Sequence, residues 1–480
     1  MREAPLVPLL PAGDTNVTVM DGHDESTCSS SSAADEDETI ELMPAQEETA
    51  QSVMFISDMD PLSVQMGDLA IPLLGEDLEL YNPPGWTSPS PTIDMMLGSA
   101  AIFASLPTNG PLTGEDHQAL GYYDTDEFFG FGSKCPSWST HALLRKMATS
   151  SATLFYLLLA AASSELGHSW ETNRGSMLDN AERNYRIGRQ CLARSISPTS
   201  DPLEVMASFW FLYINQRRRP EKLRISYPAL SSLMTEYITQ SGLLKILLSA
   251  NNDGVSQSWP NYTPKRKALL ARLTTWLFWV DTQACFQGEG GTMARVLAQS
   301  ISTKGVLAMF DISTEALKLN WDTSYPREML VDDMIDKSSL KLLHHTWILF
   351  QEVNQAVDAS PTLFLDHASG LEIKARIEAL RQKSSITPVF SLTESKARVR
   401  DRLLANSDWA VANFYSLMIY HFRSGIRTGE LEEVIDNPPL HSHEEISGTV
   451  DALMVLIQKS LATPDKRQTG KKIAETLVQY

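Results

Sequence analysis

Cysteine is scarce in this chain of 480 residues, and the four cysteines that occur are widely scattered. Cys28, Cys135, Cys191 and Cys285 are more than 50 positions apart in every case, so no pair has the CxxC spacing of a redox or zinc site. A disulfide framework like that of small secreted domains is therefore not expected. We expect the protein to work in a reducing compartment inside the cell.

The chain also lacks a secretory signal and a long hydrophobic run. Residues 1–20 contain Glu3, Asp14 and three prolines instead of a basic start followed by an apolar stretch. One uncharged run that could span a membrane, residues 147–164, includes six serines and threonines. Its strongly apolar centre, residues 154–162, is shorter than half of the ~20 residues that a spanning helix needs. We expect a buried core helix there and no membrane partner.

Basic residues are nearly absent from the first 140 positions. This part contains 24 Asp and Glu but only Arg2 and Lys134, so its formal charge is 2 − 24 = −22, whereas the remainder carries 38 − 35 = +3. A wholly basic protein that coats nucleic acid is excluded, because the chain as a whole repels phosphate. The asymmetry predicts an acidic segment attached to a nearly neutral folded body.

Residues 1–140 are predicted to be a disordered, acidic and Ser-rich segment. They contain a serine run, an acidic block and proline pairs without helix or strand periodicity, so little apolar surface can be buried to offset the entropy of ordering. Short apolar clusters nevertheless lie among the acids, as in the segment LLGEDLELY at residues 73–81. This composition is typical of activation regions that bind a coactivator groove, and equally of a solvated linker. The candidate activation contacts are Tyr122, Tyr123, Phe128, Phe129 and Phe131.

From residue 141 to 480 the pattern changes to helix. Apolar residues recur at steps of three and four, and a capping box with Asp201, Pro202 and Glu204 predicts a helix start at that point. A second capping box, Ser391 with Glu394, is expected to open a later helix. Strand-like alternation is nearly absent, so an all-α fold is predicted. Helices are expected at residues 141–166, 181–195, 229–248, 265–286, 293–302, 327–333, 340–357, 371–383, 391–422, 443–460 and 471–478, besides the one starting at 201.

The sharpest catalytic motif is an aspartate-rich DDxxD segment formed by Asp332, Asp333 and Asp336. Terpene cyclases and prenyl transferases use this pattern to hold magnesium and diphosphate, and Asp332 and Asp336 share one helix face. The second metal motif that those enzymes need is interrupted by Pro361 downstream and by Pro260 upstream. The segment is therefore interpreted first as a solvated acidic face or helix end, with a magnesium-dependent enzyme as the alternative.

Histidine and glycine motifs give no further chemistry. His441, His443, Glu444 and Glu445 resemble a ligand cluster, but two carboxylates in a first helical turn also complement the helix dipole. Of the histidine pair at 344 and 345, at least one is expected to be a satisfied core or boundary residue rather than a base. The sequence contains no G-x-S-x-G elbow and no P-loop. No catalytic residue, and hence no enzyme, is predicted.

Basic residues gather in three short patches. Lys265, Arg266 and Lys267 follow Pro264, which suits either a nuclear-import address or the charged first turn of a helix. The other patches surround residues 217–224 and 466–472. None is interleaved with aromatic residues in the manner of a single-strand binding groove.

In order along residues 141–421, the chain resembles the regulatory domain of fungal binuclear zinc-cluster transcription factors. The resemblance is carried by HALLRKMATSSATLFYLLLAAASSEL, DPLEVMASFWFLY, YPALSSLMTEYITQSGLL, LLARLTTWLFWVDTQACFQGEGG and YPREMLVDDMIDKSSLKLLHHTWILFQEV. It implies an all-α domain that regulates an activation region in the nucleus, acting on genes such as metabolic or biosynthetic clusters. It also favours the structural interpretation of the aspartate-rich segment.

The chain departs from that family in its cysteines. The family's zinc cluster needs six closely spaced cysteines, so no residue here takes over a zinc-ligand or DNA-contact role. We expect no cofactor in this chain, whereas full-length relatives bind zinc, and we expect contact with DNA only indirectly or through a missing zinc cluster. The predicted partners are a coactivator or other transcription proteins and a second copy in a homodimer. The alternatives to a transcriptional regulator are the magnesium-dependent cyclase or transferase and a non-enzymatic helical scaffold.

Overall fold

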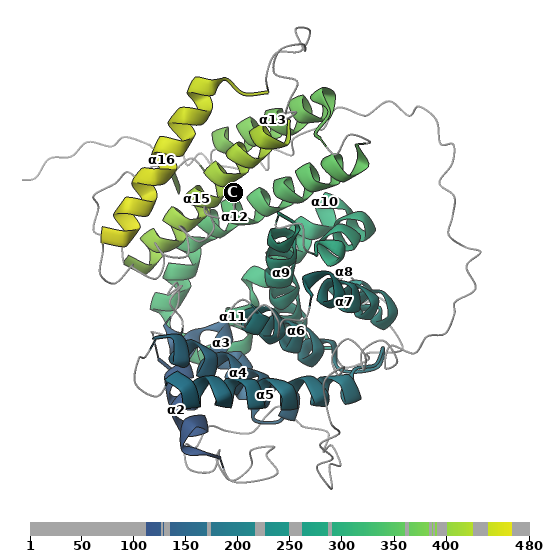
Figure 1. Ribbon diagram of the computed structural model, residues 1–480, viewed down its shortest axis with the longest axis vertical. Helices are drawn as coiled ribbons and strands as arrows, with labels where there is room; N and C mark the ends of the chain where they lie inside the picture. The colour runs from purple at the N-terminus through teal and green to yellow at the C-terminus, as the bar shows by residue number, and fades with distance from the viewer. Residues whose placement is uncertain are drawn as a thin grey trace, which may run out of the picture. The chain divides into compact units, whose positions relative to one another are not determined.

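The computed structural model describes residues 112–125, 128, 135–169, 174–216, 226–248, 262–286, 290–360, 364–383, 386, 389–390, 401–425 and 440–462. All of these belong to one unit, Ser63–Tyr480. They form helices and no strand, which confirms the all-α fold for the described part of the chain (Figure 1). Residues 1–111 lie outside it, so their disorder stays a prediction.

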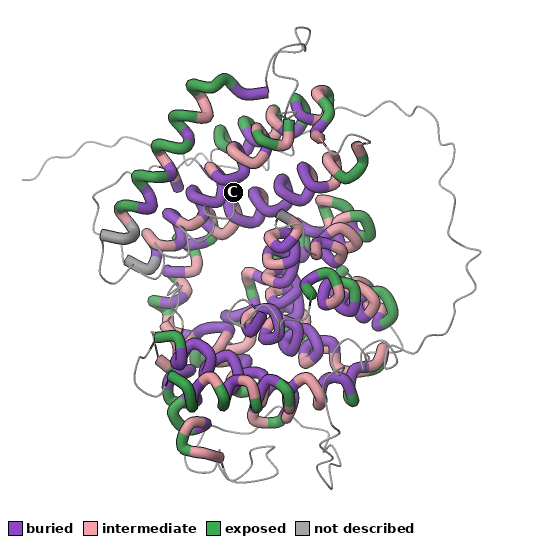
Figure 2. The backbone as a smooth tube through the Cα atoms, in the orientation of Figure 1, coloured by how far each residue is buried: buried purple, intermediate pink, exposed green. Residues whose placement is uncertain are grey.

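The first group of helices is built around α4, which is buried on nearly every side. Fourteen of its 18 residues are buried, which confirms the core helix expected for the uncharged run (Figure 2). Gly188 of α5 lets α4 and α5 approach closely, because a Cβ there would lie 2.7 Å from Leu157 Cγ. The helices of this group are α2 (Gly114–Tyr123), η2 (Pro136–Trp138), α3 (Thr140–Ala148), α4 (Ala152–Ser169), α5 (Arg174–Ser195) and α6 (Pro202–Gln216).

The second group surrounds α9, which packs against α6, α8, α10, α11 and α12. Its buried Asp281 joins two neighbouring helices, since the Tyr213 hydroxyl donates to Oδ1 at 2.7 Å and the Ala294 amide donates to Oδ2 at 2.9 Å. Gly242, with φ of +67°, ends α7 and starts α8. The helices are α7 (Tyr227–Ser241), α8 (Leu243–Leu248), α9 (Pro264–Phe286), α10 (Thr292–Thr314), α11 (Ala316–Trp321) and η4 (Asp322–Ser324).

The third group is held together by α12, the longest helix described. It packs against α9, α10, α13 and α15, and α15 in turn packs against α16 (Figure 1). The buried carboxylate of Asp408 in α15 accepts a hydrogen bond from Lys459 Nζ of α16 at 3.2 Å. The helices are α12 (Arg327–Ala359), α13 (His367–Gln382), α15 (Asp401–Ser424) and α16 (His443–Ala462).

The helix boundaries differ from the prediction in several places. The helix predicted at 141–166 is two helices, α3 and α4, and the one at 229–248 is divided at Gly242. The helices predicted at 327–333 and 340–357 are one continuous helix, α12, and the one at 293–302 continues to Thr314 through a kink at Ser302. The capping box of Ser391 and Glu394 and the helix at 471–478 lie outside the described residues.

The predicted boundary between acidic segment and helical body at residues 140 and 141 is wrong. Residues 114–123 form α2, which Thr113 caps: its hydroxyl accepts from the Asp116 amide at 3.2 Å while the Asp116 carboxylate accepts from the Thr113 amide at 3.0 Å. The Asp116 carboxylate also accepts from Asn180 and Asn184 of α5, at 3.1 and 2.9 Å. Burial opposes ionisation, but these hydrogen bonds together lower the pKa of Asp116. The helical body therefore includes residues from Leu112 onward.

Candidate functional site

The aromatic residues predicted as activation contacts lie in the hydrophobic core where the structure describes them. Tyr122, Tyr123 and Phe128 are 6%, 0% and 8% exposed, and the rings of Tyr123 and Phe128 are 4.6 Å apart. The Tyr123 hydroxyl donates to the His141 carbonyl at 3.2 Å. These three side chains stabilise the attachment of α2 and are not presented to a partner, which corrects the prediction. Phe129 and Phe131 lie outside the described residues.

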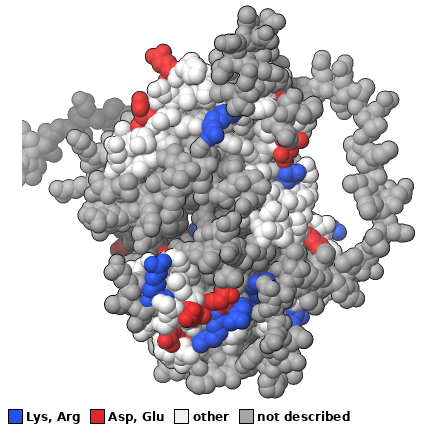
Figure 3. Space-filling model, in the orientation of Figure 1, with Lys and Arg blue, Asp and Glu red and all other residues white. Residues whose placement is uncertain are grey.

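The basic patch at Lys265, Arg266 and Lys267 forms the first turn of α9. Lys265 Nζ lies 3.0 Å from the Asp322 carboxylate, and Arg266 pairs with Asp201 at the start of α6. Burial lowers the pKa of Lys267. The patch thus stabilises helix contacts, and a role in nuclear import stays a prediction. On the face shown in Figure 3, acidic and basic side chains of the described residues are interspersed.

The aspartate-rich segment lies in the second turn and third turn of α12. Asp332 and Asp336 are buried, whereas Asp333 is half-buried and accepts a hydrogen bond from the Tyr325 hydroxyl at 2.8 Å. Arg272 of α9 lies close enough to Asp336 for the two charges to interact, and burial lowers the pKa of Arg272 to about 10. Among the described residues no group of three His, Cys, Asp or Glu side chains is arranged to hold a metal ion.

Of the histidine pair in α12, His344 is fully buried with both ring nitrogens satisfied. Trp279 Nε1 donates to its Nδ1 at 3.0 Å, and its Nε2 lies 3.2 Å from the Val306 carbonyl. The ring stacks on Phe310 with centroids 4.5 Å apart. Because an indole N–H can only donate, Nδ1 must be the acceptor and Nε2 must carry the proton. The expectation of a satisfied core histidine is confirmed.

A second histidine pair joins α13, α15 and α16. His421 Nε2 lies 3.0 Å from the Gly370 carbonyl, His421 Nδ1 lies 2.9 Å from His441 Nε2, and His441 Nδ1 lies 3.1 Å from the Glu445 carboxylate. Lys374 Nζ lies 3.7 Å from the same carboxylate. The sequence showed His441 and Glu445 as neighbours, but nothing local predicted the contact with His421.

This chain of contacts has acceptors at both ends, so its protons can be counted. The Gly370 carbonyl needs a proton on one ring, the Glu445 carboxylate needs one on the other, and the contact between His421 and His441 needs a third. Two neutral imidazoles carry only two protons, so with both rings neutral one of the three contacts has no proton. Burial lowers the pKa of both rings, to about 4 for His421, and Glu445 opposes this at His441. Burial therefore favours the neutral form of both rings, while Glu445 favours a proton on the adjacent His441.

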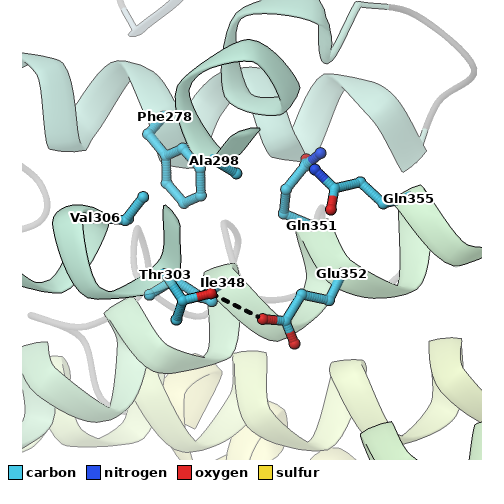
Figure 4. Close-up of a pocket in the computed structure, with 8 residues that line it drawn as sticks. All are labelled: Phe278, Ala298, Thr303, Val306, Ile348, Gln351, Glu352 and Gln355. Atoms are coloured by element: carbon cyan, nitrogen blue, oxygen red, sulfur yellow. Dashed lines mark hydrogen bonds between the residues drawn. The ribbon is translucent and has the colours of Figure 1, made fainter. Parts of the chain in front are cut away.

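A small pocket lies between α9, α10 and α12 (Figure 4). It has a volume of about 80 Å³ and lies beside Ser302, whose φ of +58° kinks α10. The side chains that line it are Phe278, Ala298, Thr303, Val306, Ile348, Gln351, Glu352 and Gln355. Phe278, Val306 and Ile348 form apolar walls of the pocket. Glu352 of α12 is the only charged side chain among these eight.

Only some of the polar side chains that line the pocket have hydrogen-bond partners among the described groups. Glu352 pairs with Arg376, whose Nη2 donates to Oε1 at 2.8 Å, and Thr303 Oγ1 donates to the same oxygen at 3.4 Å. Burial raises the pKa of Glu352, and Arg376 opposes the rise. Gln351 Oε1 and Gln355 Nε2 are buried without a hydrogen-bond partner among the described groups. A pocket of this size accommodates two or three waters, at ~30 Å³ each, and is well below the roughly 300 Å³ at which drug-sized ligand sites begin.

Comparisons of the chain with models of protein families, with curated proteins and with solved structures found no match. Within the described part of the chain, no helix combines the length and the apolar character that a membrane span requires.

Proposed function

We propose that the protein is a transcriptional regulator, in which an acidic segment recruits a coactivator and a helical body controls it. The observation that carries the proposal is the distribution of charge on the two sides of residue 112, the first residue that the structure describes. Residues 1–111 contain one basic and 19 acidic side chains, so their charge is 1 − 19 = −18, whereas residues 112–480 carry 39 − 40 = −1. Almost the whole net charge therefore lies in residues 1–111.

The composition of that part suits binding of a partner protein. Apolar side chains such as Leu74, Leu78 and Tyr81 are interspersed with Glu76, Asp77 and Glu79. Acidic neighbours keep such side chains hydrated until a hydrophobic groove accepts them. The resemblance of the helical body to the regulatory domain of fungal zinc-cluster transcription factors supports the same function. The proposal includes nuclear localisation and assigns no catalytic residue, metal or cofactor to this chain.

A reporter experiment tests the activation half of the proposal. Residues 1–111 are fused to an unrelated DNA-binding domain, and reporter expression is measured beside that domain alone. We expect activation by the fusion and its loss when Leu74, Leu78 and Tyr81 are replaced by alanine, which preserves the charge. A silent fusion that accumulates to the level of its control would refute activation.

The location of the full chain tests the other half. A fluorescently tagged protein is expected to accumulate in the nucleus, and exclusion from the nucleus would leave the scaffold and the magnesium-dependent enzyme as alternatives. Lys265→Ala is the informative variant because the Lys265 side chain is exposed and its ion pair with Asp322 is a surface pair worth at most about 1 kcal/mol. Reduced nuclear accumulation of this variant would support the import role of the patch.

A further inference from the structure

Helix α16 lies along α15 and is anchored just before it begins (Figure 1). Leu440 is buried in a slot between α13 and the end of α15, because its Cδ1 lies 2.7 Å from the place that a Cβ on Gly370 or on Gly425 would take. The adjacent His441 is also buried and contacts His421 of α15. We name Leu440 and His441 the α16 anchor.

The two imidazole rings at the α16 anchor face each other through one nitrogen each. The outer nitrogens face acceptors: His421 Nε2 lies 3.0 Å from the Gly370 carbonyl, and His441 Nδ1 lies 3.1 Å from the Glu445 carboxylate. The inner nitrogens, His421 Nδ1 and His441 Nε2, are 2.9 Å apart. One proton between them makes a hydrogen bond, but a proton on each would set two N–H groups against each other at this distance. The contact therefore tolerates at most one inner proton.

The charges that face this pair come from α13 and α16. Glu445 of α16 and Glu378 of α13 favour a proton on His441, while Lys374 of α13 opposes it. Lys374 Nζ also lies 3.7 Å from the Glu445 carboxylate. At His421, burial, the neighbouring His441 and Lys374 outweigh the carbonyl of α13 and Glu445, so the pKa of His421 is lowered to about 4. A positive charge on both rings at once is therefore opposed by the docked structure.

We propose that the histidine pair is a pH-sensitive anchor, which keeps α16 docked on α15 while the pair holds at most one inner proton and releases α16 when both rings are protonated. In the released state the rings are separated and hydrated, so neither N–H opposes the other. Release uncovers the buried face of α16, which carries Leu453, Leu456 and Ile457, and the surface of α15 beneath it. This anchor does not depend on any role in transcription.

The direction of the pH effect follows from the protons that each state binds. Between pH 7 and pH 5 the docked pair holds fewer protons than the released pair, so a falling pH favours release. The contribution of the pair to docking is complete above the released pKa and is lost as the pH falls toward the docked pKa. With a pKa of about 4 docked and about 6.5 released, His421 alone raises the equilibrium constant for opening of α16 about 20-fold between pH 7 and pH 5.

Amide hydrogen exchange in the full chain tests the anchor. Exchange of α16 peptides is measured by mass spectrometry at pH 7 and pH 5 and divided by their intrinsic rate at each pH, which gives the opening constant. We expect this constant to rise at least tenfold at pH 5. His421→Gln retains a donor for the Gly370 carbonyl but does not titrate, so its rise should be less than threefold. The exposed His443→Gln, in the first turn of α16, is the matched control and should keep the tenfold rise.

Two further measurements separate release of α16 from other effects. The buried helix α4 reports global unfolding, so its opening constant at pH 5 should stay below that of α16, and equal constants would overturn the proposal. Thr449→Cys places a thiol on the buried face of α16 without changing a histidine. Its reaction with a pyridyl disulfide, relative to a free cysteine peptide, should be at least tenfold faster at pH 5 than at pH 7.

The thiol measurement decides the case in which His421→Gln has already lost docking at pH 7. Equal thiol reactivity at the two pH values would then overturn the proposal. An opening constant of the wild type that does not change with pH, or an equal rise in His421→Gln, would overturn it as well.

Discussion

His344 provides the most quantitative test of the packing described above. The ring is 0% exposed, and its contacts with Trp279 and Val306 fix the neutral tautomer. Protonation of Nδ1 would set a ring N–H against the Trp279 N–H inside the core. Burial, with the neighbouring His345 and against the hydrogen bond to Val306, lowers the pKa of His344 to about 3.

The sign of the pH effect follows from this shift. The pKa of a histidine in the unfolded chain is about 6.5, so the unfolded state takes up a proton at a pH where the folded state does not. Stability from this residue is complete above the unfolded pKa and is lost as the pH falls toward the folded pKa. Between pH 7 and pH 5 the loss from His344 alone is about 2 kcal/mol.

The variant His344→Gln isolates this contribution. A glutamine oxygen can accept from Trp279 and its amide can donate to the Val306 carbonyl, but the side chain does not titrate. The free energy of unfolding is measured by urea unfolding, followed by helical circular dichroism, at pH 7 and pH 5. Its decrease between the two pH values should be about 2 kcal/mol smaller in the variant than in the wild type. The control is His117→Gln on the exposed side of α2, whose free energy of unfolding should decrease between pH 7 and pH 5 as much as that of the wild type. Equal losses in the wild type and His344→Gln, within about 0.5 kcal/mol, would contradict the neutral buried ring.

Two further substitutions test helix contacts, each with a control on the same helix. Glu445→Gln removes the carboxylate that lies 3.1 Å from His441 Nδ1 and 3.7 Å from Lys374 Nζ, so amide hydrogen exchange in α16 should accelerate at least fivefold, whereas the exposed Glu444→Gln should leave it unchanged; equal exchange in both variants would refute a stabilising role of the Glu445 carboxylate. Gly188→Ala places a Cβ 2.7 Å from Leu157 Cγ and should cost about 1–3 kcal/mol of unfolding free energy, while Gly175→Ala meets nothing within 4 Å and should cost nothing measurable in urea unfolding. Similar stability of the two alanine variants would show that α4 and α5 do not require the close approach.

Sequence periodicity predicted the fold class because most helices combine an apolar face with a capping signal. The start of α6 at Pro202 follows the capping box that the sequence indicated. The continuity of α12 was missed because the second and third turns expose apolar side chains and bury Asp332 and Asp336, the reverse of the usual pattern. The kink at Ser302 was not predicted because position 302 holds neither glycine nor proline, the residues that usually mark a kink.

At the candidate sites, local sequence patterns failed mainly where residues from helices that are far apart in the sequence come into contact. His421 and His441 are 20 residues apart, and the residues that flank the pocket come from three helices. Only packing of the complete body brings them together. The buried state of His344 was predictable, since apolar neighbours surround it along α12, but its two hydrogen-bond partners come from α9 and α10.

The place of α2 in the helical body changes how the activation hypothesis must be tested. Two acids in α2 and at its end have structural roles: Asp116 caps the helix and binds α5, and Asp124, which follows the helix, lies 3.9 Å from Arg145 of α3. The Tyr122 and Tyr123 rings are buried against the body. A fusion cut at residue 140 would separate α2 from that body and expose these rings beside acidic groups. Such a fragment has the composition of an activation segment without being one in the intact protein, so a positive reporter signal from it would be ambiguous. A fusion ending at residue 111 contains none of the described core, and its activity therefore reports on the acidic segment alone.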